Sequence, residues 1–159
     1  LFRSLFGSAI GSGVKEILFG QLPHLSGTTQ IPYDDTPPLI TEGTQFFSQT
    51  ITMNVPTGRL LVWLSTIVSI SNASRKATIS LWRDSTLIGI TAVSVGNAND
   101  PSTTTFIEVD APGAAGTYLY TARIGVDGGA TWRIGGWTGD ANYGGTANTN
   151  NQYVVMKVE

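Results

Sequence analysis

Residues 41–71 constrain the fold more than any other part of this 159-residue chain. From Phe47 to Val55 apolar and polar residues largely alternate, which is the period of a strand with one buried face. Pro56 and Gly58 interrupt this pattern. An almost unbroken apolar run over residues 60–70 follows, as in a strand covered on both faces. Two strands joined at a Pro-x-Gly turn predict a β-hairpin at the centre of an all-β domain.

The chain after this stretch repeats the pattern of short apolar strands and polar turns. Nineteen glycines, with many Ser, Thr and Asn residues, are typical of such a chain. No helix alternates with the strands, so parallel βαβ units are excluded. The prediction is an antiparallel, eight-stranded jelly-roll sandwich over residues 45–159, with an immunoglobulin-like sandwich as the alternative. The further strands are expected at 75–82, 86–95, 103–110, 117–126, 130–137 and 152–159.

Composition excludes several classes of function. The chain has no Cys and one His, so it offers neither disulfides nor a Cys- or His-rich zinc site. Nine Lys and Arg residues, with a net charge of −2, do not supply the basic patch that nucleic-acid binding needs. No apolar run reaches the ~18 to 20 residues of a membrane span. We therefore expect no metal site, no cofactor, no nucleic-acid partner and no membrane span.

The sequence also lacks recognisable catalytic equipment. The single histidine, His24, lies in a Pro-rich segment without a Ser/His/Asp pattern, and no Gly-Lys-Ser/Thr ending marks a phosphate-binding loop. Glu108 and Asp110 lie two residues apart on one face of a predicted strand, a spacing that permits a catalytic carboxylate pair. Solvent-facing strand charges are the commoner case. Asp34 and Asp35 are interpreted as a solvated turn cap rather than a cation site. The chain is predicted not to be an enzyme.

The first twenty residues differ from the rest. Their apolar residues recur near helical spacing, with Ser4 as a cap and Gly20 as an end. We predict a helical anchor over 1–20 and an extended, Pro-rich connector over 21–44. The helix has three alternative roles: packing on its own domain, docking as a peg on another protein or on itself, or membrane activity. The lack of a basic face favours the peg. The candidate docking residues are Phe2, Leu5, Phe6, Ile10, Val14 and Ile17.

Aromatic residues near the C-terminus suggest a ligand surface. Trp132, Trp137 and Tyr143 lie in or beside a Gly- and Asn-rich segment, and aromatic faces beside amide side chains are suited to binding a glycan. The competing interpretation places the two tryptophans in the core or in a subunit interface. Trp63 and Trp82 lie within predicted strands and are expected to be packing residues.

Three sequence motifs resemble a domain of tailed-phage structural proteins. The resemblance covers roughly residues 41–159. The chain departs from the pattern where residues 53–56 replace a direct Thr-Pro step, and where the loop at 138–151 is longer. The first motif has Thr41, Gly43, Gln45, Phe46, Ile51 and Thr52; the second has Trp82, Arg83, Asp84 and Ser85; the third has Tyr120, Thr121, Ala122, Arg123, Ile124 and Gly125; a Gly-rich loop and an apolar strand, from Gly144 to Val158, close the pattern.

This resemblance implies a jelly-roll module similar to the trimeric, tumour-necrosis-factor-like heads of phage fibres and spikes. It implies a virion protein that decorates capsids, forms head spikes or builds tail fibres, with the N-terminal residues as its attachment arm to capsid, portal or tail proteins. The alternative is a receptor-binding head that holds a host glycan in its C-terminal loops. Low charge content and abundant apolar strand faces further predict a homotrimer.

Overall fold

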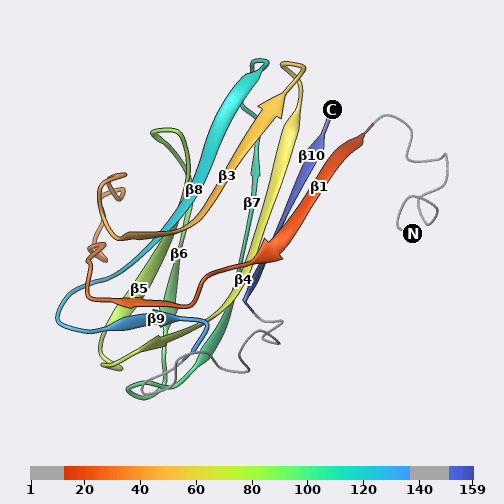
Figure 1. The fold of residues 1–159 in the computed structure, drawn as a ribbon. Helices are drawn as coiled ribbons and strands as arrows, with labels where there is room; N and C mark the ends of the chain where they lie inside the picture. Colours follow the sequence, from red (N-terminus) through yellow and green to blue (C-terminus); the bar gives the residue numbers. More distant parts are fainter. Residues whose placement is uncertain (1–12, 137–150) are drawn as a thin grey trace.

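The computed structural model describes residues 13–136 and 151–159. Within these ranges the strands form two antiparallel sheets, and no helix is long and apolar enough to cross a membrane (Figure 1). The first sheet runs in the order β1 (Val14–Gln21), β10 (Gln152–Val158), β4 (Arg59–Ile70), β9 (Trp132–Ile134) and β2 (Leu25–Gly27), with β7 (Ser102–Asp110) paired to the other edge of β4. The second sheet has the order β3 (Thr44–Met53), β8 (Gly116–Val126), β5 (Lys76–Arg83) and β6 (Thr86–Ser94).

The predicted all-β, antiparallel sandwich of jelly-roll type is confirmed. Each of the eight predicted strands is present, and β1 and β2 are additional. Alternate residues of β4, among them Leu60, Val62 and Leu64, are buried in one apolar cluster with residues of β5 and β8. Because both sheets contribute to a single core, the fold encloses its apolar side chains without disulfides. The largest fully buried side chains are Trp132, Tyr120, Ile31, Ile51, Met53, Leu60, Leu64, Ile70, Ile79, Leu81, Ile124 and Ile134.

The predicted central hairpin is wrong in its pairing. Strands β3 and β4 follow one another in the sequence but lie in different sheets: β3 pairs with β8, whereas β4 pairs with β10, β7 and β9. The turn at Pro56 and Gly58 therefore carries the chain from one layer to the other. The alternation of β3 reports which of its faces is buried, but it does not report which strand lies alongside.

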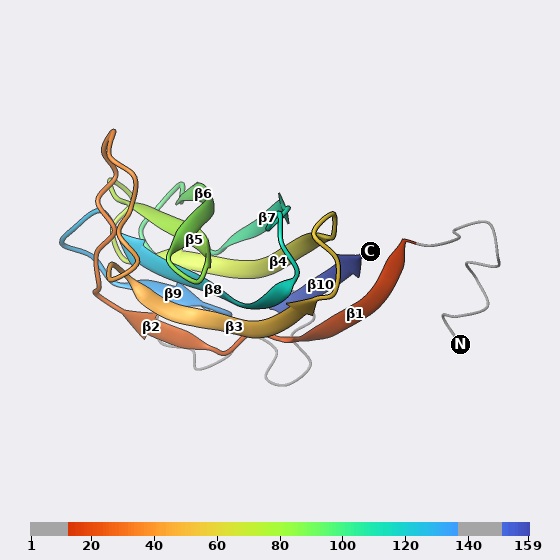
Figure 2. The same cartoon turned by 90° about the horizontal axis from the view of Figure 1, so that it is seen from above.

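The predicted N-terminal helix is also wrong in its described part. Val14–Gln21 forms strand β1, which pairs with β10 along its whole length, so the C-terminal end lies beside the start of β1 (Figure 2). A β-bulge between Val14 and Glu16 shifts the register, so Val14 and Ile17 share one face although they are three residues apart. The spacing interpreted as helical is the spacing of a bulged strand. Residues 1–12 lie outside the described residues.

The connector between β1 and β3 is held closely against the second sheet. Ile31 is fully buried, and its N–H donates to the carbonyl oxygen of Val126 at 3.2 Å. A side chain at Gly125 would place its Cβ 2.6 Å from the backbone nitrogen of Ile31. Gly43, at the end of the connector, has a φ of 67°, a conformation that favours glycine. These two glycines of the phage-like motifs therefore allow the connector to lie directly on β8.

Candidate functional site

Of the three aromatic residues predicted as a ligand surface, Trp132 alone lies in the described part of the chain. Trp132 is fully buried at the start of β9, where its indole N–H donates to the hydroxyl of Thr29 at 3.2 Å and its ring covers Gly27. It is a core residue and presents no ring face to a ligand. Trp137 and Tyr143 lie outside the described residues, so a ligand surface built on them stays a prediction.

The other two tryptophans have opposite environments. Trp82 is buried, and its indole N–H donates to the hydroxyl of Ser80 at 2.9 Å, as expected for a packing residue. Trp63 is 40% exposed on the outer face of β4. The expectation that Trp63 packs inside the domain is therefore wrong, because β4 is covered by the core on one side only along this part of its length.

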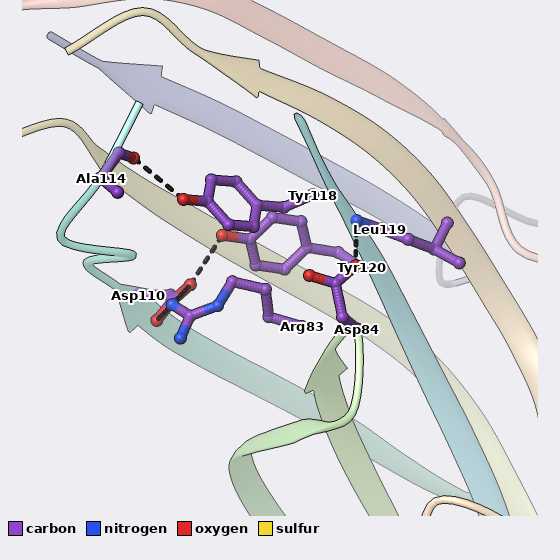
Figure 3. Close-up of polar contacts among 7 residues, drawn as sticks. All are labelled: Arg83, Asp84, Asp110, Ala114, Tyr118, Leu119 and Tyr120. Atoms are coloured by element: carbon purple, nitrogen blue, oxygen red, sulfur yellow. Dashed lines mark hydrogen bonds and ion pairs between the residues drawn. The ribbon is translucent and has the colours of Figure 1, made fainter. Parts of the chain in front are cut away.

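A polar cluster of Arg83, Asp110 and Tyr120 lies at one end of the sandwich (Figure 3). One guanidinium nitrogen of Arg83 donates to both carboxylate oxygens of Asp110, at 2.8 and 2.7 Å, and the hydroxyl of Tyr120 donates to Asp110 at 2.6 Å. Asp110 is 8% exposed. The expectation that Asp110 is a solvent-facing strand charge is therefore wrong. The ion pair connects β5 with β7, and the hydrogen bond from Tyr120 adds β8, so the cluster joins the two sheets.

The phage-like motifs converge on the same end and on the connector. Beside the cluster, the carboxylate of Asp84 accepts from the N–H of Leu119 at 3.0 Å (Figure 3). The guanidinium of Arg123 donates to the carbonyl oxygens of Glu42 and Gly43, at 2.7 and 2.9 Å. These motif residues thus hold neighbouring strands and the connector in place. They stabilise the fold, and their side chains are already occupied by these hydrogen bonds.

Burial, together with the hydrogen bond to Asp110, raises the pKa of Tyr120 above its ordinary value of 10.0. The folded state therefore favours the neutral phenol. Its contribution to stability is complete below about pH 10 and is lost as the pH rises further. We expect Tyr120 to ionise only when the protein unfolds, so the ultraviolet absorbance change of its phenolate should coincide with the loss of circular dichroism.

The variant Tyr120→Phe checks this expectation. It should remove the coincident absorbance step and flatten the decline of stability above about pH 10. An unchanged alkaline titration in the variant would contradict the assignment.

The acidic turn of the connector behaves as a cap. One carboxylate oxygen of Asp34 accepts from both the N–H and the hydroxyl of Thr36, at 2.8 and 2.6 Å, and these hydrogen bonds lower the pKa of Asp34. The turn lines a cleft of about 120 Å³ against β5 and β6, with Tyr33 and Ile90 among its walls. No group of three or more potential metal ligands occurs in the described ranges.

The outer face of the first sheet carries an apolar surface that the sequence analysis did not identify. Directly opposed residues of an antiparallel sheet share a face, and the register places two rows of four apolar residues across β1, β10, β4 and β7. One row is Phe19, Val154, Trp63 and Ile107; the next is Ile17, Met156, Leu61 and Val109. We call these eight residues the outer apolar face.

Several members of this face are strongly exposed. Phe19 is 80% exposed, and Ile17, Ile107 and Val109 are 46%, 53% and 54% exposed. Val14 extends the face at one end of β1, at 43% exposure. These residues form one continuous apolar region, unlike the single apolar residues scattered over the surface of most proteins. The local signal for it was the almost unbroken apolar run of β4, in which Leu61 and Trp63 point outward between inward residues that are also apolar.

Comparisons with known proteins give no family for this chain. No family model matches it, and no curated protein matches it. Among solved structures, the C-terminal CBM6 of LamC, a marine laminarinase from Zobellia galactanivorans, has 15% identity and a TM-score of 0.36, covering 89% of this chain and 99% of that domain. The infectious bursal disease virus structure of the Gx strain has 11% identity and a TM-score of 0.45, covering 91% of this chain and 36% of that chain.

A VP2 subviral particle of infectious bursal disease virus is similar in the same way. Its identity is 11% and its TM-score 0.38, with 91% of this chain and 37% of that chain covered. This chain therefore spans little more than a third of either viral chain. At these sequence identities and TM-scores, the similarities do not indicate what this chain binds or what it assembles into.

Proposed function

We propose that this chain is a non-enzymatic structural protein of a bacteriophage particle: a capsid decoration, a head spike or a tail-fibre component. The observation that carries the proposal is the outer apolar face, which is suited to assembly and contains no charged side chain in its two rows. The phage-like motifs supply the particle context, and the described polar clusters are occupied by hydrogen bonds that hold the fold together.

Attachment to the particle is proposed for the residues that precede β1. Phe2, Leu5, Phe6 and Ile10 form an apolar segment there. Val14 and Ile17, predicted for the same role, belong to β1 and lie on the outer face of the sheet. We therefore assign Val14 and Ile17 to that face and leave attachment to the residues before them.

Deletion of residues 1–12 tests the attachment role. The deletion stops before β1, so the pairing of β1 with β10 is retained and the head should keep its thermal unfolding midpoint. We expect the shortened protein to be lost from particles assembled in its presence, as measured by protein content of purified virions. Incorporation at the level of the full chain would show that these residues are not the anchor.

The oligomer proposed here is a homotrimer. Low charge content, 13% of residues, together with the outer apolar face, leaves more apolar surface than one core uses. Sedimentation equilibrium should give the mass of three 16.8 kDa subunits. A mass that stays at one subunit over the micromolar range would contradict the oligomer.

A second candidate function is recognition of a host glycan. It rests on the Gly- and Asn-rich composition around Trp137 and Tyr143. On a glycan array, the full chain should bind a defined saccharide, and Trp137→Ala should abolish that signal. No binding by a multivalent form of the full chain would leave the structural role alone.

A further inference from the structure

We infer that the outer apolar face is the surface through which copies of this chain contact one another. This inference rests on the proposed assembly role and names the partner of that surface: a second copy of the chain. Two features of the described residues support it, namely the contrast between the two outer faces of the sandwich and the layout of the outer apolar face itself.

The two outer faces of the sandwich differ in chemistry. On the second sheet, exposed apolar residues have polar partners on the neighbouring strand: Ile90 lies opposite Ser80, and Leu119 lies opposite Thr50. On the first sheet, apolar residues lie opposite apolar residues across four strands.

The connector covers part of the second sheet's outer face, where Ile31 lies against Gly125. On the first sheet, Phe19, Ile107 and Val109 remain 80%, 53% and 54% exposed, and a continuous apolar face of this kind suits an apolar partner in the assembled protein.

The layout of the apolar face is that of an interface core with a polar rim. The next row beyond Phe19 consists of uncharged polar residues, and Arg59 lies at the opposite end, in register with Val158. Four strands at ~4.8 Å spacing and two apolar rows at ~6.8 Å spacing give on the order of 260 Å² of projected area per subunit. The polar row is Gln21, Gln152, Ser65 and Thr105.

The projected area of the two apolar rows corresponds to the central part of an interface. A standard interface buries about 800 Å² of accessible surface per partner, and the accessible surface of protruding side chains exceeds their projected area. The two apolar rows therefore supply the central part of a contact between copies, and the polar row supplies part of its rim.

A second copy fits this surface better than a charged or polar partner. The two apolar rows offer no charge for electrostatic complementarity, so the partner must present apolar surface of similar shape. Every copy of the chain carries such a surface. An exposed aromatic ring, Trp63, lies in the middle of the face, where anchor residues of interfaces are found.

The test compares two isoleucines that match in exposure and differ in location. Ile107 on β7 is 53% exposed within the outer apolar face, and Ile90 on β6 is 52% exposed on the opposite sheet. Each is replaced by Lys in the full chain, and sedimentation equilibrium is measured over a range of concentrations. We expect Ile107→Lys to weaken self-association at least about tenfold, whereas Ile90→Lys leaves it unchanged. Circular dichroism and thermal unfolding confirm that both variants are folded.

Three results would overturn the inference. The first is a one-subunit mass for the unaltered chain at all concentrations. The second is equal self-association of the unaltered chain and Ile107→Lys. The third is a gain of association when residues 1–12 are deleted, because the chain's own N-terminal segment would then be what covers the face.

The proposed virion role is tested separately, by particle incorporation. A chain that self-associates through Ile107 but never enters particles would overturn the virion role and leave the interface standing. If the chain enters particles but Ile107→Lys self-associates as the unaltered chain does, the virion role stands and the proposed interface is overturned.

Discussion

Asp110→Ala is expected to lower the free energy of unfolding by about 3 kcal/mol. The substitution removes the carboxylate that accepts from Arg83 and Tyr120, and it leaves a guanidinium and a phenol without that partner in a largely buried site. Breaking a buried ion pair by removing one member costs about 3–5 kcal/mol, and the partial exposure of Arg83 places this case at the lower end. Urea unfolding followed by circular dichroism measures the difference.

Asp35→Ala is the matched control for this variant. Asp35 lies in the exposed turn of the connector, so its removal should change the free energy of unfolding by no more than ~0.5 kcal/mol. Equal stability of Asp110→Ala and Asp35→Ala would mean that the Arg83–Asp110 pair does not hold the two sheets together.

Trp132→Ala is expected to cost about 4 kcal/mol, a large part of the roughly 5–15 kcal/mol that stabilises a typical domain. The ring is fully buried between β9 and the connector, where it covers Gly27, and its removal leaves a cavity at the junction of β2 and β9. The loss appears as a lower midpoint of chemical unfolding.

Trp63→Ala removes the same ring from an exposed site and is the control for Trp132→Ala. In dilute protein, where copies are dissociated, it should cost less than about half as much, because Trp63 is already 40% exposed to water. At higher concentration it should instead weaken self-association. The reverse order of stabilities would show that Trp132 is not the core residue of the pair.

The environments of these residues explain why sequence reasoning identified the fold but not the interaction surface. A charged residue such as Asp110 is usually exposed, and an aromatic residue such as Trp132 or Trp63 is usually buried, but these tendencies hold only on average. Their actual environments depend on which strands lie alongside them. Pairing of β7 with β4, and packing of the second sheet against both, bury Asp110 beside Arg83. The same pairing of β7 with β4 extends the exposed row through Trp63.

Alternating and continuous apolar stretches were sufficient to predict eight of the ten strands described and the antiparallel sandwich, because strand periodicity is a local property of the chain. Sheet membership was decided only by tertiary structure, as β3 and β4 show by their separation into two layers. The conformation of Val14–Gln21 was also decided there, because β10 supplies the hydrogen-bonding partner that makes it a strand. The outer apolar face exists only across four strands distant in sequence, and the pattern of a single strand does not show its extent.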